Sequence, residues 1–378
     1  MRIVHLADTH LGYRQFAGKL DPDKQINQRE SDVYGVWHRA VDLAIERKID
    51  AVIHAGDVFD SPRPSPRALS EALEGLGRLR DAGIPVIAIA GNHSTPRFRS
   101  GGSVFEVLEH FGVHVAWGAP QTFRIGDVAF HAVPHEADAE QLKADIAELE
   151  PDPSAAANVL MLHADLSAVP SPTYGEINAT ELEQEVIEQA PFDYIAMGHL
   201  HRYQAPQINA IYPGSLERLD FADLVGEKAV LEVDLAAGAG GSGFVVRHAL
   251  WTRPMFDVPV ACEACDPQEV LSRLEAELDG KDLDGSVVRV RLDRMQRDVY
   301  QALHFGAVDE LLEPCLHHVL QVGSGGLQTS TDGDTPELAF APFAREHVPA
   351  GLDPERVIAV AQGFLSDAQA EELEEAGA

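Results

Sequence analysis

Five short apolar runs in the first 235 residues constrain the fold more than any other feature of this sequence. Each run is four to six residues long, and longer amphipathic stretches separate them. The runs are RIVHLA (2–7), AVIHA (51–55), PVIAIA (85–90), NVLMLH (158–163) and YIAMG (194–198). Apolar segments of this length suit strands that are buried on both faces. The sequence therefore predicts buried strands at these five positions.

The stretches between the first three runs have the periodicity of helices. VYGVWHRAVDLAIERK (33–48) places its apolar residues on one helical face. SPRALSEALEGLGRLRDAG (65–83) does the same with leucines spaced three or four residues apart, and Gly83 is a suitable helix stop. Strands that alternate with helices in this way predict a layered α/β domain.

The pattern changes at about residue 229. Two β-rich segments, AVLEVDL and FVVRHALW, flank the glycine-rich AAGAGGSG (236–243), which is typical of a turn. A smaller α/β unit follows, because PQEVLSRLEAEL is amphipathic and SVVRVRL has the composition of a strand. The Gly/Ser/Thr-rich SGGLQTSTDGDTPE (324–337) predicts a mobile linker. We predict a first domain at 1–254, a small domain at 255–322, a linker at 323–339 and a helical segment at 340–378.

Length and composition are those of an ordinary globular protein. The chain has 378 residues, 45% hydrophobic and 24% charged, which is enough for two or three domains. No apolar run reaches the roughly 18 residues that a membrane span needs, and the first residues are too polar for a secretory signal. Three cysteines argue against a disulfide framework and indicate a reducing cytoplasm. A zinc site that includes Cys262 and Cys265 is the less favoured interpretation of the thiols.

The formal net charge of −32 is unusual for a protein that binds phosphate groups, since Lys and Arg drive such binding. The charge is unevenly distributed. Residues 1–100 carry 14 basic and 13 acidic side chains, whereas residues 101–200 carry 2 basic and 17 acidic ones. The acidity therefore lies away from the first hundred residues, and bound divalent metals would add positive charge at a site.

Polar side chains of metal-ligand type follow each of the five apolar runs. In chain order they are Asp8 and His10, then Asp57, then Asn92 and His93, then His163, then His199 and His201. Ligands of open α/β sheets bind in the crevice at the carboxyl ends of the strands. Glycines at 56, 91 and 198 immediately precede the polar residues and permit sharp turns. We therefore expect these side chains to meet in one site.

Carboxylates, an amide oxygen and several imidazoles suit manganese, iron or zinc better than calcium. A carboxylate shared by two ions roughly 3.5–4 Å apart makes a clamp for in-line attack on phosphorus. Each residue alone has a simpler explanation, because an isolated DxH is often a loop and an isolated GNH is often a turn. Five strand ends that each supply a ligand type make coincidence a poor explanation. His5 and His54 lie within the runs, and we interpret both as core or supporting residues.

The order DxH, GDxxD, GNH, a strand-end His and GHxH over residues 1–220 resembles the calcineurin-like metallophosphoesterases. This resemblance implies a four-layer α-β-β-α sandwich with a two-metal centre. By motif, Asp8, His10 and His201 would hold the first ion, and Asn92, His163 and His199 the second. Asp57 would bridge the ions, and His93 would be the catalytic residue that protonates or stabilises the leaving oxygen.

Four longer segments are similar to a narrower group, the SbcD/Mre-type DNA repair nucleases. They are HLGYRQF (10–16), the amphipathic helix after INQRESDVY (26–34), HAGDVFDSPRPS (54–65) and YPGSLERLDF (212–221). The resemblance implies a manganese-dependent 3′-to-5′ exonuclease on duplex ends that also cuts single strands in double-strand-break repair. It implies a homodimer, a capping domain at about 255–322 and a nucleoid location. An SMC-like ATPase of the SbcC type would be the partner, bound through a carboxyl-terminal helical segment.

Several further residues have two interpretations. Tyr13, Arg14 and Gln15 would contact the DNA backbone or else pack within their loop. Arg97 and Arg99 would contact phosphate or else remain solvated. Ser94 departs from the family pattern, which has an acidic residue after GNH. Its hydroxyl could hydrogen-bond His93 but carries no charge to stabilise a protonated imidazole.

Two other functions remain open. A phosphoesterase of the same fold that acts on a small phosphodiester or a phosphoprotein would explain the ligands and suit the acidic surface better. It would not explain the extra 130 or so residues or the longer motifs. A largely non-catalytic scaffold for the ATPase is the third possibility, and the presence of His93 beside all seven ligand positions argues against it.

Overall fold

The computed structural model describes residues 1–16, 20–94, 102–169 and 179–323. The chain forms two compact units, the larger of which contains residues 1–257, 280–289 and 312–319. Within the described residues, no helix combines the length and the apolar character that crossing a membrane requires. Except for Gly323, the predicted linker and the predicted segment 340–378 lie outside the described residues.

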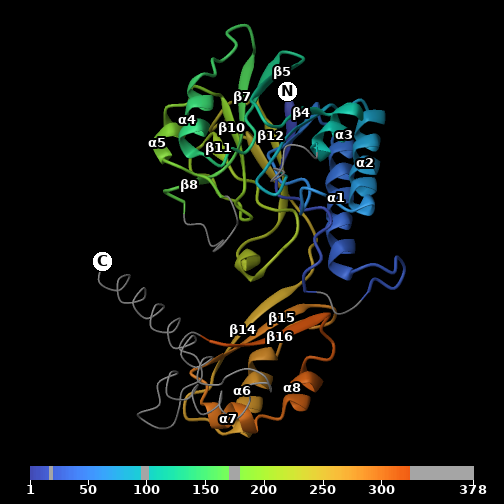
Figure 1. Ribbon diagram of the computed structural model, residues 1–378, viewed down its shortest axis with the longest axis vertical. Coiled ribbons are helices and arrows are strands. Elements are labelled where there is room, and N and C mark those ends of the chain that lie inside the picture. Colours follow the sequence, from blue (N-terminus) through green and yellow to red (C-terminus); the bar gives the residue numbers. More distant parts are fainter. Residues whose placement is uncertain (17–19, 95–101, 170–178, 324–378) are drawn as a thin grey trace, which may run out of the picture. The chain divides into compact units, whose positions relative to one another are not determined.

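Two sheets form the centre of the larger unit (Figure 1). The six-stranded sheet has the order β13-β12-β1-β2-β3-β4. Its strands are β1 (Arg2–Leu6), β2 (Ala51–His54), β3 (Val86–Ile89), β4 (His114–Ala116), β12 (Ala229–Asp234) and β13 (Val245–Ala249). Strands β1 to β4 run parallel, whereas β12 is antiparallel to β1. The carboxyl ends of β1, β2 and β3 therefore lie at the same edge of this sheet.

The five-stranded sheet has the order β11-β10-β7-β6-β5. Its strands are β5 (Gln121–Ile125), β6 (Val128–Ala132), β7 (Ala157–His163), β10 (Tyr194–Gly198) and β11 (Ala210–Ile211). Strands β7 and β10 are parallel, and their last residues, His163 and Gly198, are paired in register. The short strands β8 (Asp165–Leu166) and β9 (Glu181–Leu182) form a separate two-stranded sheet.

Side-chain caps set the starts of most helices in the larger unit. These helices are α1 (Gln28–Glu46), α2 (Pro66–Asp81), α3 (Val104–His110), α4 (Ala139–Ala147), α5 (Gln184–Glu188) and the 3-10 helix η2 (Phe221–Leu224). Asn27 caps α1, and Ser65 caps α2 ahead of a proline in the first turn. Ser103 and Glu106 form a capping box at α3.

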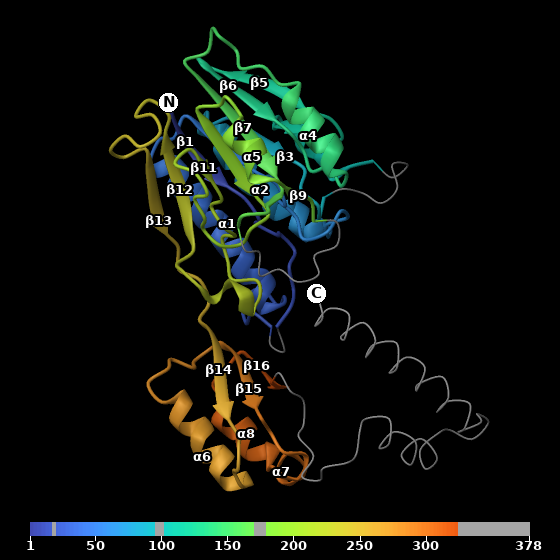
Figure 2. The same ribbon diagram turned by 90° about the vertical axis from the view of Figure 1, so that its left-hand side faces the viewer.

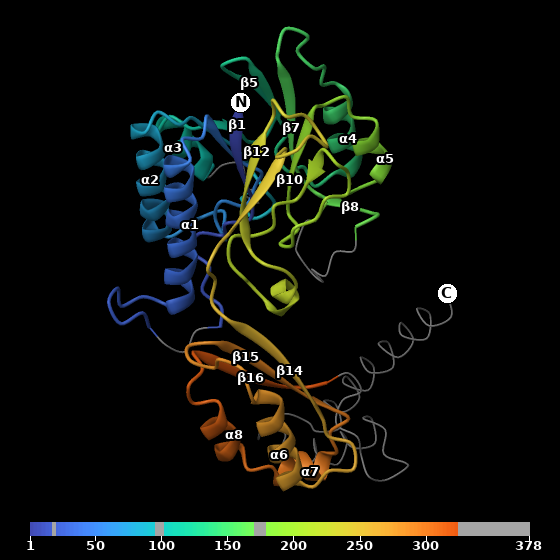
Figure 3. The ribbon, with the colours of Figure 1, turned by 180° about the vertical axis from the view of Figure 1, so that it is seen from behind.

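Three apolar clusters stabilise the larger unit. The first joins the six-stranded sheet to helices α1 to α3, and the third joins the five-stranded sheet to α4 and α5. The second contains Ile3 and Ile53 from one sheet and Val159 and Met161 from the other. Figure 3 shows α1 to α3 and α4 to α5 on opposite sides of the two sheets. Successive strand residues point to opposite faces, and Ile3 and Val4 of β1 belong to different clusters. Both faces of β1 are therefore buried.

The structure confirms the predicted mixed α/β class. All five apolar runs form strands, and both predicted amphipathic helices are present as α1 and α2. The glycine-rich segment 236–243 connects β12 to β13, as expected. Strands β4 to β6 and helix α4 were not predicted. Strand β5 has no fully buried residue, so it lacks the apolar run that identified the other strands.

His5 and His54 are buried in their strands, as the sequence indicated. The His5 ring lies 2.8 Å from the Tyr194 hydroxyl, measured at Nδ1, and His54 contacts the Thr9 hydroxyl. Burial lowers the pKa of His5 to about 3, with a smaller contribution from His54. His5 is therefore neutral in the folded protein at any pH near neutrality.

This burial predicts an acid-sensitive contribution to stability. Between pH 6.5 and 3 the unfolded chain binds a proton at His5 that the folded chain does not, so the unfolding free energy falls as pH falls. A double variant, His5→Leu with Tyr194→Phe, removes both polar partners. Urea unfolding in chelator should show its pH slope smaller than the wild-type slope by about 1 kcal/mol per pH unit near pH 5. Parallel pH profiles for the two proteins would contradict the assignment.

A third sheet, β14-β15-β16, carries three helices (Figure 2). Its elements are β14 (Met255–Ala261), α6 (Pro267–Leu278), β15 (Val287–Asp293), α7 (Arg297–Ala302), α8 (Phe305–Leu311) and β16 (His317–Val322). Helix α6 and strand β15 coincide with the amphipathic segment and the strand expected there. Val288, Val290 and Leu292 of β15 are buried, and less buried arginines alternate with them.

Candidate metal centre

All seven predicted ligands lie in the larger unit, where β1, β2, β3, β7 and β10 end. None of the seven is more than 8% exposed. They are Asp8, His10, Asp57, Asn92, His163, His199 and His201. Polar side chains are rarely buried at this density without a shared purpose.

The side chains form two groups. In the first, Asp8, His10 and His201 place one ligand atom each within 4.8 Å of the others. In the second, Asp57, His163 and His199 do the same. This division agrees with the two ligand sets that the motifs imply, apart from the position of Asp57.

Asp57 and Asn92 connect the ligands. Asp57 Oδ2 lies 3.1 Å from His163 Nε2 and 4.0 Å from His10 Nε2, so this carboxylate faces both groups. Asn92 Oδ1 lies 2.9 Å from His163 Nε2 and 3.2 Å from His199 Nδ1. The amide oxygen therefore belongs with the second group.

Three glycines make this convergence possible. A Cβ on Gly56 would lie 2.1 Å from His163 Nδ1, and one on Gly91 would lie 2.2 Å from Asp57 Oδ1. A Cβ on Gly198 would lie 1.8 Å from the carbonyl oxygen of Ala55. Gly56 also has φ +99°, a conformation that side chains disfavour. The glycine in each motif is thus required by the approach of a ligand or of the backbone that holds it.

The backbone is strained at the ligands themselves. Asp8, His10, Asp57 and His199 have φ values of 52°, 47°, 53° and 98°, and they are four of the nine non-glycine residues with positive φ in the described chain. Each such residue costs on the order of 1–3 kcal/mol and persists where its surroundings fix it. The amide of Asp8 donates to Gly56 O at 3.1 Å, and the amide of His199 donates to Asp8 Oδ1 at 3.1 Å. Such strain is typical of functional sites.

Charge and burial are in conflict in this site. Burial raises the pKa of Asp8 above its ordinary value, against the effect of nearby histidines. Burial acts on Asp57 in the same direction, but His163 outweighs it and the pKa of Asp57 lies well below its usual range. Burial opposes the charged form of His163, yet Asp57 and Asp8 raise its pKa to about 9. The carboxylates therefore draw positive charge into the site.

The donor set fits divalent cations. His10 Nε2 has no hydrogen-bond partner among the described residues, and neither does Asn92 Nδ2. Buried polar atoms without partners are costly, and a cation would satisfy the ring nitrogen. Mixed carboxylate, amide and imidazole donors are those of transition-metal sites.

The sequence analysis did not identify three carboxylates that surround the ligands. Asp60 Oδ1 lies 3.3 Å from His10 Nδ1, Asp165 Oδ2 lies 3.4 Å from His199 Nε2, and Asp223 Oδ2 lies 3.3 Å from His201 Nδ1. A carboxylate that holds the second ring nitrogen fixes the orientation and tautomer of a metal-binding histidine. Asp60 ends the GDxxD motif and Asp165 follows His163 by two residues, which is the signal that could have found them.

Lys228 holds the backbone at His201 in place. Its Nζ donates to His201 O and to Ser215 Oγ, each at 2.7 Å, and lies 3.7 Å from Asp223 Oδ1. Asp223 also accepts from the Leu219 amide at 3.0 Å. Lys228 and Asp223, which follow the YPGSLERLDF segment, therefore position the last predicted ligand. Ser215 and Leu219 of that segment contact them in turn.

The same segment meets INQRESDVY in a buried charge network. Arg29 is fully buried and lies 2.9 Å from Asp32 and 3.7 Å from Glu217. Arg253 also pairs with Asp32. Burial raises the pKa of Glu217, which Arg29 opposes. INQRESDVY and YPGSLERLDF, which resemble segments of the nuclease family, are thus joined by buried ion pairs near the site.

His93 lies at the edge of the centre. Its amide donates to Asp57 Oδ1 at 3.0 Å, and its Nδ1 lies 3.1 Å from the carbonyl oxygen of Asp60. Its ring centroid is 4.7 Å from that of His10. The Ser94 hydroxyl, only 1% exposed, has no hydrogen-bond partner among the described residues, so it does not hold His93. The backbone carbonyl oxygen of Asp60, and not the Ser94 hydroxyl, is the hydrogen-bond partner of the His93 ring.

The candidate DNA-contacting residues differ in their exposure to solvent. Tyr13 is 5% exposed and its hydroxyl donates to Leu219 O, so it packs within the core, and its interpretation as a DNA contact is corrected. Arg14 is exposed and lies 3.3 Å from Glu30, and Gln15 is exposed. Arg97 and Arg99 lie outside the described residues.

Comparison with known proteins agrees with this geometry. The sequence model for calcineurin-like phosphoesterases matches residues 1–203. The DNA double-strand break repair protein Mre11 of Sulfurisphaera tokodaii is 32% identical over 211 residues, which are 55% of this chain and 51% of that protein. The protein of the same name from Haloferax volcanii is 28% identical over 294 residues, 77% of this chain and 61% of its own. The chain spans about half the length of most of the curated relatives it matches.

Solved structures also match. The protein TT1561 of Thermus thermophilus covers 66% of this chain and 98% of its own length, with 14% identity and a TM-score of 0.40. The purple acid phosphatase PPD1 from yellow lupin covers 54% of this chain and 38% of its own, with 17% identity and a TM-score of 0.36. The family match spans more than half of the chain and includes every ligand position, which confirms the family that the motifs indicated. The chain belongs to the calcineurin-like phosphoesterases.

Proposed function

We propose that this chain is a metal-dependent phosphodiesterase that cuts DNA, as the nuclease subunit of a double-strand-break repair complex. The observation that supports the chemistry is the pair of buried ligand groups that meet at Asp57, with His93 at their edge. The similarity to proteins named for DNA double-strand break repair supports the substrate.

The two groups would hold two divalent ions. Asp8, His10 and His201 would bind the first, and Asn92, His163 and His199 the second. Asp57 would bridge them, since its carboxylate faces both groups. When bound, the ions would supply Lewis acidity toward a phosphoryl group and offset the charge that develops on its oxygens.

The protein's own residues would orient the reacting groups. His93 would deliver a proton to the leaving oxygen from Nε2, because its Nδ1 faces the carbonyl oxygen of Asp60 and is fixed as the N–H. The His93 amide holds Asp57 Oδ1, which leaves Oδ2 directed toward the ligands. The proposed phosphodiesterase activity would require that His93, Asp60 and Asp57 keep these positions together.

Several finer features of the proposal come from the family resemblance. We propose manganese as the metal, 3′-to-5′ exonuclease activity on duplex ends together with single-strand endonuclease activity, and a homodimer in the cytoplasm near the nucleoid. The partner would be an SMC-like ATPase. Arg14 and Gln15 would lie near the DNA, and their exposure is compatible with this.

We also propose a domain plan. A four-layer α-β-β-α phosphoesterase domain would span residues 1–254, which the three apolar clusters support. A capping domain would span 255–322, where the three-stranded sheet and its helices lie. The linker at 323–339 and the partner-binding segment at 340–378 rest on sequence composition alone.

Digestion of an end-labelled DNA duplex tests the proposal. Purified protein would be assayed with Mn²⁺, with Mg²⁺ and with chelator. We expect shortening from the 3′ end that requires Mn²⁺ and stops when a chelator removes the metal. Metal-dependent hydrolysis of a small bis-phosphodiester without DNA cleavage, even after addition of the ATPase, would favour the small-substrate phosphoesterase. No hydrolysis of either substrate would favour the scaffold.

The environment of His201 leads to a separate prediction about metal affinity. Asp223→Asn should weaken binding at the first ion site by about 10- to 100-fold, since the carboxylate that orients His201 is lost. Calorimetric titration with Mn²⁺ would measure both sites. Asp220→Asn, a same-type change in the same segment, keeps a side-chain oxygen that can accept from the Ala222 amide at the cap of η2 and should leave both affinities unchanged. Equal affinities in wild type and Asp223→Asn would show that Asp223 has no orienting role.

A further inference from the structure

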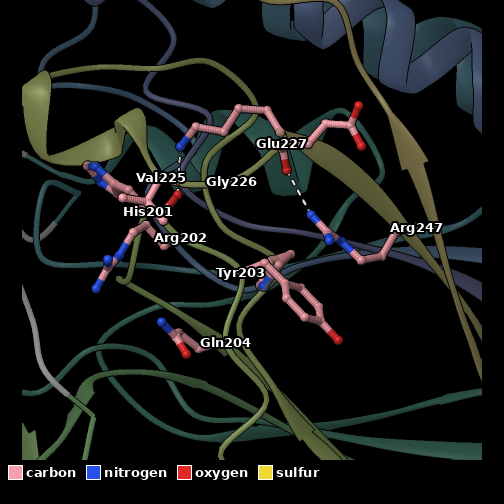
Figure 4. A pocket seen from close by; sticks show the side chains of 10 residues that line it. His201, Arg202, Tyr203, Gln204, Val225, Gly226, Glu227 and Arg247 are labelled. Atoms are coloured by element: carbon pink, nitrogen blue, oxygen red, sulfur yellow. Dashed lines mark hydrogen bonds between the residues drawn. The ribbon is translucent and has the colours of Figure 1, made fainter. Parts of the chain in front are cut away.

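A cavity of about 130 Å³ opens beside His201 (Figure 4). The segment that continues from His201 forms one wall, and the segment that leads into β12 forms another. The lining residues are His201, Arg202, Tyr203, Gln204, Pro213, Val225, Gly226, Glu227, Lys228 and Arg247. Because His201 belongs to the first ligand group, an occupant of this cavity would lie one side chain away from the metal centre.

The charge of this lining contrasts with that of the protein. The chain has 61 acidic and 29 basic residues, yet three of the lining side chains are basic and one is acidic. The acidic one, Glu227, is exposed. Lys228 lies at the inner wall and is only 5% exposed. Its ammonium group is held by His201 O, Ser215 and Asp223. The positive charge of the open part of the lining therefore comes from the two arginines. Such a local excess of positive charge attracts anions.

Arg247 is held in a fixed position over the cavity. Its guanidinium carbon lies 4.3 Å from the centroid of the Tyr203 ring, and its Nη2 donates to the carbonyl oxygen of Glu227 at 2.7 Å. Figure 4 shows these contacts from close by. Neither partner carries a negative charge at these atoms, and Arg247 forms no ion pair within the described part of the chain. Its charge is therefore available to an anion, and its planar group suits phosphate oxygens.

The backbone of this wall is closely constrained. Gly214 has φ +81°, and a Cβ there would lie 2.8 Å from His201 O. Lys228 Nζ donates to the same oxygen at 2.7 Å. The segment that contains Arg202 and Tyr203 is thus anchored immediately next to a predicted metal ligand.

We propose that this cavity binds a phosphate group of the DNA strand, adjacent to the bond cut at the metal centre, with Arg247 as the main contact. The proposal rests on the proposed function and names a subsite of it. The cavity has room for a phosphate group, and a cationic, partly aromatic lining is the type that follows a nucleic-acid backbone.

Steady-state kinetics of Arg247→Gln provides the test, with a single-stranded oligonucleotide and bis(4-nitrophenyl) phosphate as substrates. We expect KM for the oligonucleotide to rise about threefold to tenfold, with kcat unchanged, because one phosphate contact is lost. Hydrolysis of the small diester, which has no second phosphate to place in the cavity, should stay at the wild-type level and would show that the centre is intact. Arg247→Lys should recover part of the loss, since it keeps the charge.

A matched control is Arg80→Gln. Arg80 is also an exposed arginine that stacks on an aromatic ring, at 4.7 Å from Phe111, but it belongs to α2 and not to the cavity. It should leave both substrates unaffected. Fluorescence anisotropy of the labelled oligonucleotide in chelator gives an independent measure. The logarithmic salt dependence of its binding should decrease by about 0.7 in Arg247→Gln.

The outcomes separate the two proposals. If the wild type cuts DNA and Arg247→Gln has a wild-type KM and salt dependence, the subsite is wrong and the proposed function stands. If a mononucleotide competes as well as the oligonucleotide and loses this ability in Arg247→Gln, the cavity binds free nucleotide, and the strand assignment is overturned. If the wild type hydrolyses the small diester but neither cuts nor binds DNA, both proposals fail.

Discussion

His93→Asn is expected to lower kcat for phosphodiester hydrolysis by about 10²- to 10⁴-fold, the usual contribution of a positioned proton donor. The imidazole lies between Asp60 O and the ring of His10, at the edge of the ligand groups. Asparagine keeps a polar side chain of smaller size but cannot transfer a proton. The backbone amide that holds Asp57 is unchanged by the substitution, so the number of bound ions should remain the same.

His135→Asn is a suitable control for this variant. Its ring centroid lies 6.4 Å from that of His163, and it contacts Thr180, but it is not part of either ligand group. Stopped assays with saturating Mn²⁺ and metal analysis of the same samples would compare the two variants. Unchanged kcat in His93→Asn would place proton transfer elsewhere. A loss of bound metal in His93→Asn would show that the residue acts mainly in building the site.

The buried strands were predictable because their sequence pattern has one cause. A strand that is covered on both faces is largely apolar, and β1, β2, β3, β7 and β10 follow this rule apart from a few polar residues such as His5 and His54. Edge elements follow other rules. Strand β5 lies at the edge of its sheet and has no fully buried residue, so it lacks the continuous apolar run that identified the other strands. Strand β11, with two residues, is too short to form a pattern.

The ligands were predictable for a related reason. Parallel strands bring their carboxyl ends together, so ligand-type residues that follow each strand must converge. The supporting carboxylates obey no such rule. Asp223 reaches His201 from a segment of turns and a 3-10 helix, and its role depends on the path of the chain between them. Tyr13 lies only three residues after His10, yet its hydroxyl contacts Leu219, more than two hundred residues later. Neither partner is visible in the local sequence.

Gly198→Ala is expected to have the largest effect on stability. Gly198 ends β10 and is paired with His163 at the end of β7. An added Cβ would lie 1.8 Å from Ala55 O and 2.8 Å from His163 Nδ1, distances at which the backbone of β2 must move. The same movement would break the 2.8 Å hydrogen bond between His163 Nδ1 and Ala55 O. We expect the unfolding free energy to fall by about 3 kcal/mol, at the upper end for overpacked sites.

The function should be lost together with the stability, because the hydrogen bond that breaks holds His163, a proposed ligand. Urea unfolding in chelator would measure the loss of stability without metal, and titration with Mn²⁺ would measure binding at the second site. Gly77→Ala is the matched control, since its Cβ would meet only Phe111 Cζ at an ordinary 3.6 Å within helix α2. It should raise stability by up to about 1 kcal/mol. If Gly198→Ala unfolds like the wild type and binds two ions, the close approach of β10 to Ala55 is not a requirement for the centre.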